Sequence, residues 1–309
     1  MIEAEGVRLY QITSGKLRRY LSFENFVDFF KVWGAFWQAY WILLKEKPQV
    51  LFSKGGYVSL PVAWAAWARG IPVVTHESDL VPGLATRLIA KVARKVCVSF
   101  RESTNYFGSK AVWTGNPVRS EILQGDKQRG YALTGFTVSK QTILVMGGSQ
   151  GARSINEVLE QILPELVKNL QVVHITGKHQ LAFKSPNYFA AEFLKEELKD
   201  IYAISDLLVA RAGAATLFEL AAVSKPSILI PLGPPASRGE QLKNAELFSN
   251  QGAAFVIKPA DLNAENLLKS ITDLSSNEKL RQEMSQKIAK FYTKEAAHEI
   301  RKILEQYTK

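Results

Sequence analysis

The sequence predicts an α/β protein made of two doubly wound domains, each with a parallel sheet covered by helices. Apolar runs typical of strands alternate with helical runs along almost the whole chain, which is the pattern of parallel sheets with helices on both faces. The length of 309 residues and the hydrophobic content of 47% are sufficient for two cores of ordinary size.

Eight runs have the composition of buried strands. In chain order they read VRLYQI, PQVLFS, IPVVTH, KVCVSF, TILVM, LQVVHIT, DLLVA and PSILIPL. They fall into two sets separated by a polar, turn-rich stretch at residues 124–140, which we expect to mark a domain boundary. After residue 257 come polar helices, and the last of them has the Ala, Ile and Leu spacing of an amphipathic helix.

Composition restricts the partners and the compartment. The net charge of +10 favours an anionic partner, either nucleic acid, a phosphorylated metabolite or an acidic membrane surface. We expect no nucleic acid, because no basic stripe with stacking aromatics lies outside residues 23–44. The single cysteine, Cys97, lies in an apolar run and is expected to be a buried hydrophobe in a reducing compartment. Since no secretory signal opens the chain, we expect the cytoplasm or its membrane surface.

Residues 23–44 are unusually aromatic. Phe26, Phe30, Trp33 and Trp37 recur at spacings of three and four, as one side of a helix would. The uncharged run at 32–44 is too short to span a bilayer. Two interpretations stay open: a core helix packed on a sheet, or an interfacial helix whose aromatics reach the acyl boundary while flanking Lys and Arg residues meet anionic headgroups. Both can hold, since a helix with two apolar sides can bury one and insert the other.

A Gly-rich turn, GGSQGARSINE, follows the strand TILVM. Its backbone N–H groups around Gly148, together with the Ser149 hydroxyl, could hold a diphosphate at a helix N-terminus. The pattern is neither a Walker loop nor a dinucleotide fingerprint, so a purely structural turn is the alternative.

Two later strand ends carry further polar groups. After DLLVA, the small residues of RAGAATLFELAA open a helix with Glu219 in its first or second turn. A carboxylate there suits ribose hydroxyls by analogy with dinucleotide folds, although a Glu near a helix N-terminus is also favourable by itself. After SILIPL, a polar loop contains Gln241, which could bond to a sugar or base. Three loops from strand ends are thus expected to converge on one ligand site.

The first set of strands has its own polar loops. Gly55, Gly56 and Tyr57 form an N–H-rich turn able to accept phosphate. His76 is expected just past a strand end beside Glu77, which makes it the best acid/base candidate among the four histidines. A hydrogen-bonded His–Glu brace is the alternative. No metal is expected, because no His, Cys or Asp set has ligand spacing.

Six motifs in order and spacing resemble the MurG family of bacteria, especially its Gram-positive members: KGGYVSLP, GIPVVTHESDLVPGLA, WTGNPVR, MGGSQGARSINE, ISDLLVARAGAATLFELA and PPASRGEQLKNA. The resemblance covers nearly the whole chain. It implies a GT-B fold, with two Rossmann-like domains facing across a cleft and a C-terminal helix that returns to the first domain. The division it implies is 1–120 for acceptor and membrane binding, 121–288 for the donor, and 289–309 for the returning helix.

The resemblance also implies an activity. Members of the family move GlcNAc from UDP-GlcNAc to the C4 hydroxyl of MurNAc in lipid I, with inversion, and so make lipid II for peptidoglycan. It implies a peripheral location on the cytoplasmic side of the cell membrane, contact with other cell-wall synthesis proteins, and no cofactor or metal in the chemistry.

Site residues follow from the resemblance motif by motif. The acceptor side would hold Gly55, Gly56 and Tyr57 facing the lipid diphosphate, with His76 and Glu77 at the cleft. Phe26, Phe30, Trp33 and Trp37 resemble the family's membrane-docking patch. Glu219 would bind the ribose and Leu194 would lie near uracil, in a UDP-GlcNAc site made of Arg119, Gly148, Ser149, Leu194, Ala214, Ala215, Thr216, Glu219, Gln241 and Asp79, where Asp79 replaces an Asn common elsewhere in the family.

One departure from the family concerns the start of the chain. Family members begin with a strand and a GTGGH-containing loop that supplies the His usually proposed as general base, whereas this sequence begins at a point that resembles the inside of the first domain. We therefore expect about two secondary-structure units, roughly 60 residues, to be missing. The alternatives are a truncated or split form that binds UDP-GlcNAc or membrane without full catalysis, and another nucleotide-sugar enzyme such as a lipid glycosyltransferase or an epimerase.

Overall fold

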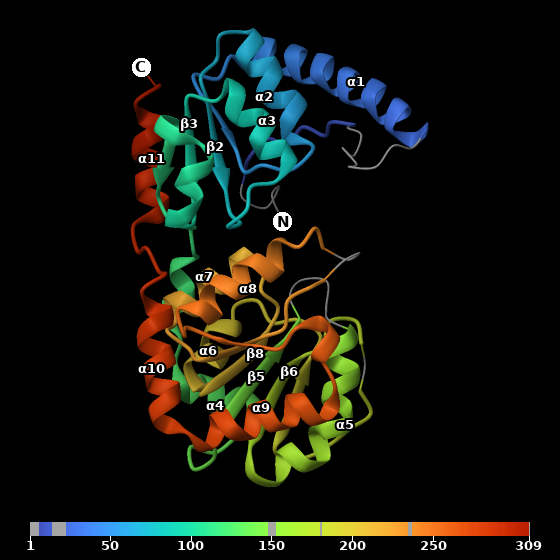
Figure 1. Ribbon diagram of the computed structural model, residues 1–309, viewed down its shortest axis with the longest axis vertical. Coiled ribbons are helices and arrows are strands. Elements are labelled where there is room, and N and C mark those ends of the chain that lie inside the picture. The colour runs from blue at the N-terminus through green and yellow to red at the C-terminus, as the bar shows by residue number, and fades with distance from the viewer. Residues whose placement is uncertain (1–5, 14–22, 148–152, 180, 234–236, 309) are drawn as a thin grey trace. The chain divides into compact units, whose positions relative to one another are not determined.

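The protein forms two compact α/β units in a computed structural model (Figure 1). The structure describes residues 6–13, 23–147, 153–179, 181–233 and 237–308, and only the backbone of 23–29. Unit 1 comprises Met1–Thr114 and Ala297–Lys309, and unit 2 comprises Gly115–Ala296. The division therefore falls at residues 114 and 296, where the sequence placed it at 120 and 288.

Unit 1 contains a four-stranded sheet in the order β1-β2-β3-β4, and every neighbouring pair is parallel. Its strands are β1 (Leu51–Ser53), β2 (Val73–Glu77), β3 (Lys95–Val98) and β4 (Ala111–Trp113). Its helices are α1 (Phe23–Glu46), α2 (Ser59–Ala68), α3 (Leu84–Val92), the 3-10 helices η2 (Arg101–Tyr106) and η3 (Gly108–Lys110), and α11 (Ala296–Glu305).

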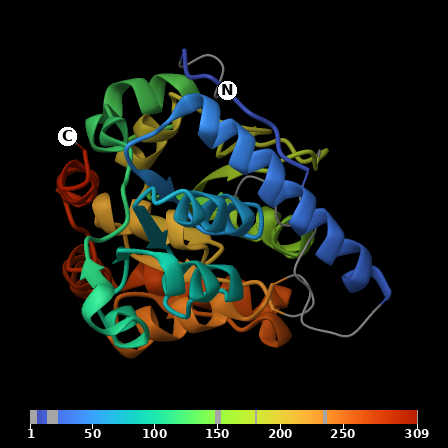
Figure 2. The ribbon, with the colours of Figure 1, turned by 90° about the horizontal axis from the view of Figure 1, so that it is seen from above.

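Alternating side chains give this sheet two apolar faces. Val73, Val96 and Val98 pack with residues of α1, α2 and α3, which lie side by side in Figure 2. The intervening Val74 and Cys97 point the other way and pack against α11 through Ile300 and Ile303. Cys97 is fully buried, as predicted, and burial raises the pKa of its thiol to about 12.

Helix α1 presents a mixed surface. It buries Ala35, Ala39 and Leu43, whereas Phe30 is 57% exposed, Trp33 56%, Trp37 44% and Trp41 63%. The helix therefore packs on the core along one side, with Phe36 and Tyr40 partly buried against it, and exposes aromatic side chains on another. Phe26 lies where side chains are not described. Within the described chain, no helix combines the length and the apolar content that crossing a membrane requires.

Unit 2 contains a six-stranded parallel sheet in the order β10-β9-β8-β5-β6-β7. Its strands are β5 (Thr142–Met146), β6 (Gln171–Ile175), β7 (Tyr188–Ala191), β8 (Leu207–Ala210), β9 (Ser227–Leu229) and β10 (Phe255–Val256). Its helices are η4 (Ser120–Gln124), α4 (Lys127–Thr134), α5 (Arg153–Asn169), α6 (Leu198–Ile204), α7 (Ala214–Ala222), α8 (Glu240–Asn250), η5 (Pro259–Asp261), α9 (Ala264–Ser276) and α10 (Glu278–Ala289).

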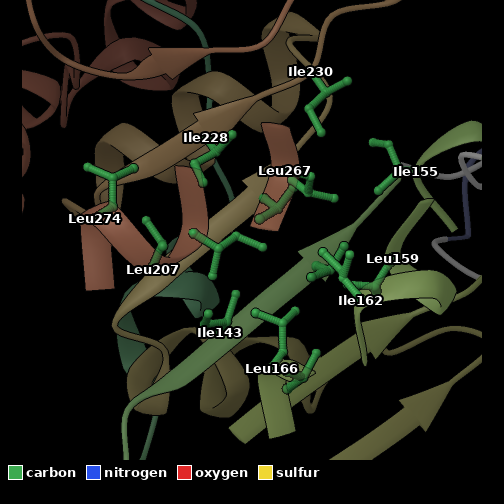
Figure 3. Close-up of a cluster of buried hydrophobic side chains, with 14 of the residues drawn as sticks. Ile143, Ile155, Leu159, Ile162, Leu166, Leu207, Ile228, Ile230, Leu267 and Leu274 are labelled. Atoms are coloured by element: carbon green, nitrogen blue, oxygen red, sulfur yellow. The ribbon is translucent and has the colours of Figure 1, made fainter. Parts of the chain in front are cut away.

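The main core of unit 2 lies between one face of this sheet and helices α5 and α9 (Figure 3). Ile143, Leu207 and Ile228 come from three adjacent strands, and Leu159 and Leu267 come from the two helices. Because each strand of the sheet centre is buried on both faces, it reads as a continuous apolar run in the sequence.

The predicted strand VRLYQI is wrong. Residues 7–13 form no strand and run along α1, where Arg8 pairs with Glu46 at 2.8 Å and the Thr13 N–H donates to Gln38 Oε1 at 3.2 Å. Val7 and Leu9 are exposed, so the apolar alternation of this run does not correspond to a buried sheet face.

The stretch at 124–140 is also not a boundary, because it contains α4, which packs on α6. Asp126 caps α4 by accepting from the Arg129 N–H, and Arg129 makes two bonds to the Asp200 carboxylate, at 3.0 and 3.1 Å. Gly130 permits the close approach, since a Cβ on it would lie 2.5 Å from the carbonyl oxygen of Asp200.

We predict opposite effects for two helical Gly→Ala changes. Gly130→Ala should destabilise unit 2 by about 1–3 kcal/mol, because overpacking against the backbone outweighs helix propensity. Gly34→Ala in α1 has open space around the added methyl group and should stabilise unit 1 by up to about 1 kcal/mol. Denaturant unfolding of each variant measures the change in the free energy of unfolding. If the two changes had the same sign, the packing argument would be contradicted.

Candidate functional site

The carboxyl ends of the central strands of unit 2 gather at one edge of the sheet. Strands β9, β8 and β5 are neighbours, and their ends lead to the N-termini of α8, α7 and α5, respectively. Helix N-termini present unpaired N–H groups and a positive dipole end, so this edge is suited to an anionic ligand.

Glu219 and Arg119 meet at this edge, as two of the residues predicted for one site. Glu219 lies in the second turn of α7, and its Oε1 is 3.5 Å from Nη2 of Arg119, which precedes η4. The buried Tyr202 hydroxyl donates to Glu219 Oε2 at 3.2 Å. Burial raises the pKa of Glu219, and the Arg119 charge and the Tyr202 hydrogen bond oppose that rise. The result is an oriented, partly desolvated carboxylate.

Arg211 is a buried cation that the sequence reasoning missed. It directly follows β8, and its Nη1 donates to the Ile230 carbonyl at 3.1 Å while its Nη2 donates to Ser154 Oγ at 2.8 Å. Its Nε has no hydrogen-bond partner among the residues that the structure describes, and burial lowers the pKa of the guanidinium. A basic residue directly after an apolar strand is the signal that could have identified it.

Gln241 lies beside the start of α7. Its Oε1 accepts from the Leu232 N–H at 3.0 Å, and its Nε2 is 3.9 Å from where a Cβ on Gly213 would be. Gly213 is the N-cap residue of α7 and has no side chain, so it gives no capping hydrogen bond to the first N–H groups of α7, those of Ala214, Ala215 and Thr216.

Other predicted donor residues are less well defined. Leu194 is buried in the segment between β7 and α6. Gly148 and Ser149 lie outside the described residues. The described chain resumes at Arg153, where α5 begins.

A buried polar relay joins α5 to β6. His174 lies inside β6, with its Nε2 3.0 Å from Asn156 Oδ1 and its Nδ1 3.0 Å from the Tyr188 hydroxyl. Burial lowers the pKa of His174 to about 4, with His179 adding a smaller effect in the same direction. His174 is therefore neutral near pH 7.

In unit 1, His76 and Glu77 lie within β2 and not past its end, which corrects the sequence placement. His76 is fully buried, and its Nδ1 is 2.9 Å from Lys54 Nζ while its Nε2 is 3.5 Å from Ser99 Oγ. A base must contact the hydroxyl that it deprotonates. His76 is thus held by a cation and a hydroxyl group, and its role as an acid or base stays a prediction.

Glu77 holds the loop that follows β2. Its Oε1 accepts from the Asp79 N–H at 3.1 Å and its Oε2 from the Gly83 N–H at 3.2 Å, at the start of α3. Burial raises the pKa of Glu77, and a Thr86 hydrogen bond opposes that rise. Glu77 therefore braces the loop that carries Asp79.

Lys54, missed by the sequence reasoning, brings a cation to the Gly55–Gly56–Tyr57 turn. Gly55 and Gly56 have φ of +80° and +84°, a conformation that favours glycine. Lys54 Nζ contacts His76 and donates to Ser78 Oγ at 3.2 Å. Desolvation lowers the pKa of Lys54, and the Glu77 and Asp79 charges oppose that fall. Among the described residues, no three His, Cys, Asp or Glu side chains gather so as to hold a metal ion.

Comparison with known proteins identifies the fold and the family. Residues 142–300 match the glycosyltransferase family 28 C-terminal domain, and residues 1–98 match the family 28 N-terminal domain. The structure resembles the crystal structure of Acinetobacter baumannii MurG, with a TM-score of 0.76 and 27% identity over 99% of this chain and 86% of that chain. A UDP-GlcNAc 2-epimerase from Neisseria meningitidis shares the fold, with a TM-score of 0.65 and 15% identity over 94% of this chain and 84% of that chain.

Two relatives are similar over most of their length. A Clostridium perfringens protein named UDP-N-acetylglucosamine--N-acetylmuramyl-(pentapeptide) pyrophosphoryl-undecaprenol N-acetylglucosamine transferase is 47% identical over 281 residues, which are 90% of this chain and 79% of that protein. A Bacillus cereus protein of the same name, numbered 2, is 44% identical over 281 residues, which are 90% of this chain and 80% of that protein.

The paired parallel sheets and the matched domains define a glycosyltransferase of the GT-B fold class. The chain belongs to glycosyltransferase family 28 and, within that family, to the MurG family. The predicted fold class and family are thereby confirmed.

His174 predicts a pH dependence of stability. In the unfolded chain its pKa returns to about 6.5, so below that pH the unfolded state binds a proton that the folded state does not. Stability should fall as the pH drops from about 6.5 to about 4, by up to about 3 kcal/mol from this group, and then level off. Denaturant unfolding at several pH values measures this.

The comparison variant is His174→Gln, which keeps a donor and an acceptor but does not titrate. The difference between the two proteins isolates the histidine from carboxylates that titrate in the same range. Parallel stability curves from pH 7 to pH 4 would refute the assignment.

Proposed function

We propose that this protein transfers GlcNAc from UDP-GlcNAc to the C4 hydroxyl of MurNAc in lipid I, producing lipid II for peptidoglycan. The observation that carries the proposal is the oriented carboxylate of Glu219, held by Tyr202 and Arg119 beside the uncapped start of α7. The names of the relatives from C. perfringens and B. cereus support the choice of substrates.

For the donor, we assign Glu219 to the ribose, since a carboxylate can accept from both of its hydroxyls. Arg119 and the N–H groups of Ala214 to Thr216 lie near Glu219 and would bind the diphosphate or sugar, with Gln241 beside them. Leu194 near the uracil, Asp79 on the sugar, and Gly148 and Ser149 on the diphosphate complete the assignment. The buried charge of Arg211 adds positive potential beside the first turn of α5.

For the acceptor, we assign the lipid diphosphate to the turn formed by Gly55, Gly56 and Tyr57, with the cation of Lys54 beside it. His76 positions that cation through Nδ1 and does not itself touch the substrate. Glu77 positions the loop of Asp79.

The reaction is a single inverting displacement. The C4 oxygen forms a bond to the anomeric carbon, the bond from that carbon to the diphosphate oxygen breaks, and the hydroxyl proton passes to water. Negative charge grows on the departing diphosphate, and helix N–H groups with Arg119 are arranged to stabilise it. These groups can supply that stabilisation without a metal or cofactor, and we propose that none takes part.

The test is GlcNAc transfer from UDP-GlcNAc to a lipid I analogue, with Glu219→Gln beside the unaltered chain. The unaltered chain should form the disaccharide product. Loss of a hydrogen bond to a charged acceptor should raise the KM for UDP-GlcNAc about 10- to 100-fold in Glu219→Gln, with the acceptor KM unchanged.

Glu246→Gln is the matched control, since Glu246 is an exposed carboxylate of the same unit that pairs with Lys243 on the surface of α8. Its KM for UDP-GlcNAc should equal that of the unaltered chain. Transfer from a different nucleotide sugar in preference to UDP-GlcNAc, or an unchanged KM in Glu219→Gln, would contradict the proposal.

We further propose that the protein docks on the cytoplasmic face of the cell membrane. The exposed aromatics of α1, with Trp67 of α2 at 60% exposure, offer an apolar surface on unit 1. Lys45 and Lys47 follow at the end of α1 and would meet anionic headgroups. We expect the acceptor, lipid I, at that membrane, and we also expect proteins of cell-wall synthesis there.

Replacing Trp33, Trp37 and Trp41 by Ser should lower binding to anionic vesicles at least about tenfold, because each half-exposed indole contributes about 1 kcal/mol on insertion. Vesicle sedimentation measures this. Phe193→Ser removes an equally exposed aromatic side chain from unit 2 and should leave binding unchanged. Equal losses in the two proteins would argue against docking through α1.

A further inference from the structure

The first turn of α5 is held by polar side chains from both strands that flank β5. On the β8 side, Arg211 donates to Ser154 Oγ at 2.8 Å. On the β6 side, His174 contacts Asn156 Oδ1 at 3.0 Å. Ser154 and Asn156 are the second and fourth residues of α5. The helix that follows the central strand is thus anchored from two directions at its beginning.

The hydrogen-bond directions in the β6 anchor are fixed by their partners. Asn156 Nδ2 donates to the Thr176 carbonyl at 2.8 Å, so its Oδ1 faces His174 as an acceptor. His174 therefore carries its proton on Nε2, and its Nδ1 accepts from the Tyr188 hydroxyl at 3.0 Å. The relay Tyr188–His174–Asn156 has a donor and an acceptor at each contact.

Burying the polar groups of this relay costs free energy, and apolar contacts already hold α5 on the sheet. Ile155 and Leu159 of α5 are fully buried in the main core of unit 2, and apolar contacts of that kind hold the helix without fixing its position along the sheet. Hydrogen bonds are directional, so buried polar contacts specify position more narrowly. The relay acts on the first turn of α5, and the first N–H groups of a helix lack partners within the helix.

We propose that His174 and Asn156, supported by Tyr188, are positioning residues that set where the first turn of α5 meets the donor diphosphate. This inference rests on the proposed function, because it assumes that UDP-GlcNAc binds at this edge. None of the three residues needs to touch the substrate. Their effect passes through the position of the helix N–H groups, where a displacement of about 1 Å can cost about 100-fold in rate.

The decisive comparison uses two asparagines that anchor opposite ends of α5. Asn156→Leu removes the anchor at the first turn, and kcat/KM for UDP-GlcNAc should fall about 10- to 100-fold with the acceptor KM unchanged within about twofold. Asn187 donates to the Val167 carbonyl at 2.8 Å, near the other end of the helix. Asn187→Leu should lower the melting temperature and leave kcat/KM for UDP-GlcNAc within about twofold of the unaltered chain.

A second pair of variants separates positioning from general destabilisation. His174→Gln keeps a donor towards Asn156 and an acceptor towards Tyr188, so it should retain most of the donor affinity. His174→Leu keeps neither and should lose about as much as Asn156→Leu. If the Leu variants do not fold, Tyr188→Phe removes one hydroxyl and should give a smaller loss, about 2- to 5-fold, in the same parameter.

Calorimetric titration with UDP-GlcNAc distinguishes a failure of the positioning role from a failure of the proposed function. If the unaltered chain does not bind UDP-GlcNAc, the proposed function fails. If the unaltered chain binds it and Asn156→Leu binds it equally well, or Asn187→Leu loses as much as Asn156→Leu, the function stands and the positioning role is overturned.

Discussion

Both sheets contain only parallel strand pairs in the described part of the chain, and this constraint governs the rest of the structure. Parallel neighbours need a crossover, so helices cover both faces and the strands are buried along their length. The same constraint brings all carboxyl ends of a sheet to one edge, so that β5, β8 and β9 end side by side. Glu219 follows one of these strand ends and pairs there with Arg119, which lies 100 residues earlier in the sequence.

The carboxyl-terminal edge of the unit 2 sheet carries ionisable side chains that are buried. Glu219, Arg211 and His174 all have their pKa shifted towards the neutral form by burial. Each is held by hydrogen bonds to neighbouring strands or helices, which offset part of the desolvation and fix their orientation. A site that must bind a charged ligand needs such oriented groups before the ligand arrives, and the stability lost to their burial is the cost of that preorganisation.

Much of the fold could be predicted from the sequence, because buried parallel strands are apolar runs that periodicity identifies directly. Parts of the site were predictable from strand ends: Glu77 is the last residue of β2, and Gln241 lies in the first turn of α8, after the loop that follows β9. Contacts between residues far apart in the sequence could not be predicted. Nothing near Tyr202 in the sequence indicates that its hydroxyl reaches Glu219. The polar stretch around Gly130 likewise does not indicate its close contact with α6. The prediction of a strand at VRLYQI was wrong, because the alternation of apolar and polar residues cannot show whether a partner strand lies beside it.

Helix α11 supplies Ile300 and Ile303 to one face of the unit 1 sheet, although it is separated from that sheet by the whole of unit 2. During synthesis, the sheet face bearing Val74 and Cys97 is therefore made before the helix that covers it, with the whole of unit 2 in between. Unit 2 is continuous in sequence and can complete its core first. Unit 2 can therefore finish folding while one face of the unit 1 sheet still lacks its covering helix, and closing that face depends on the contacts most distant in sequence.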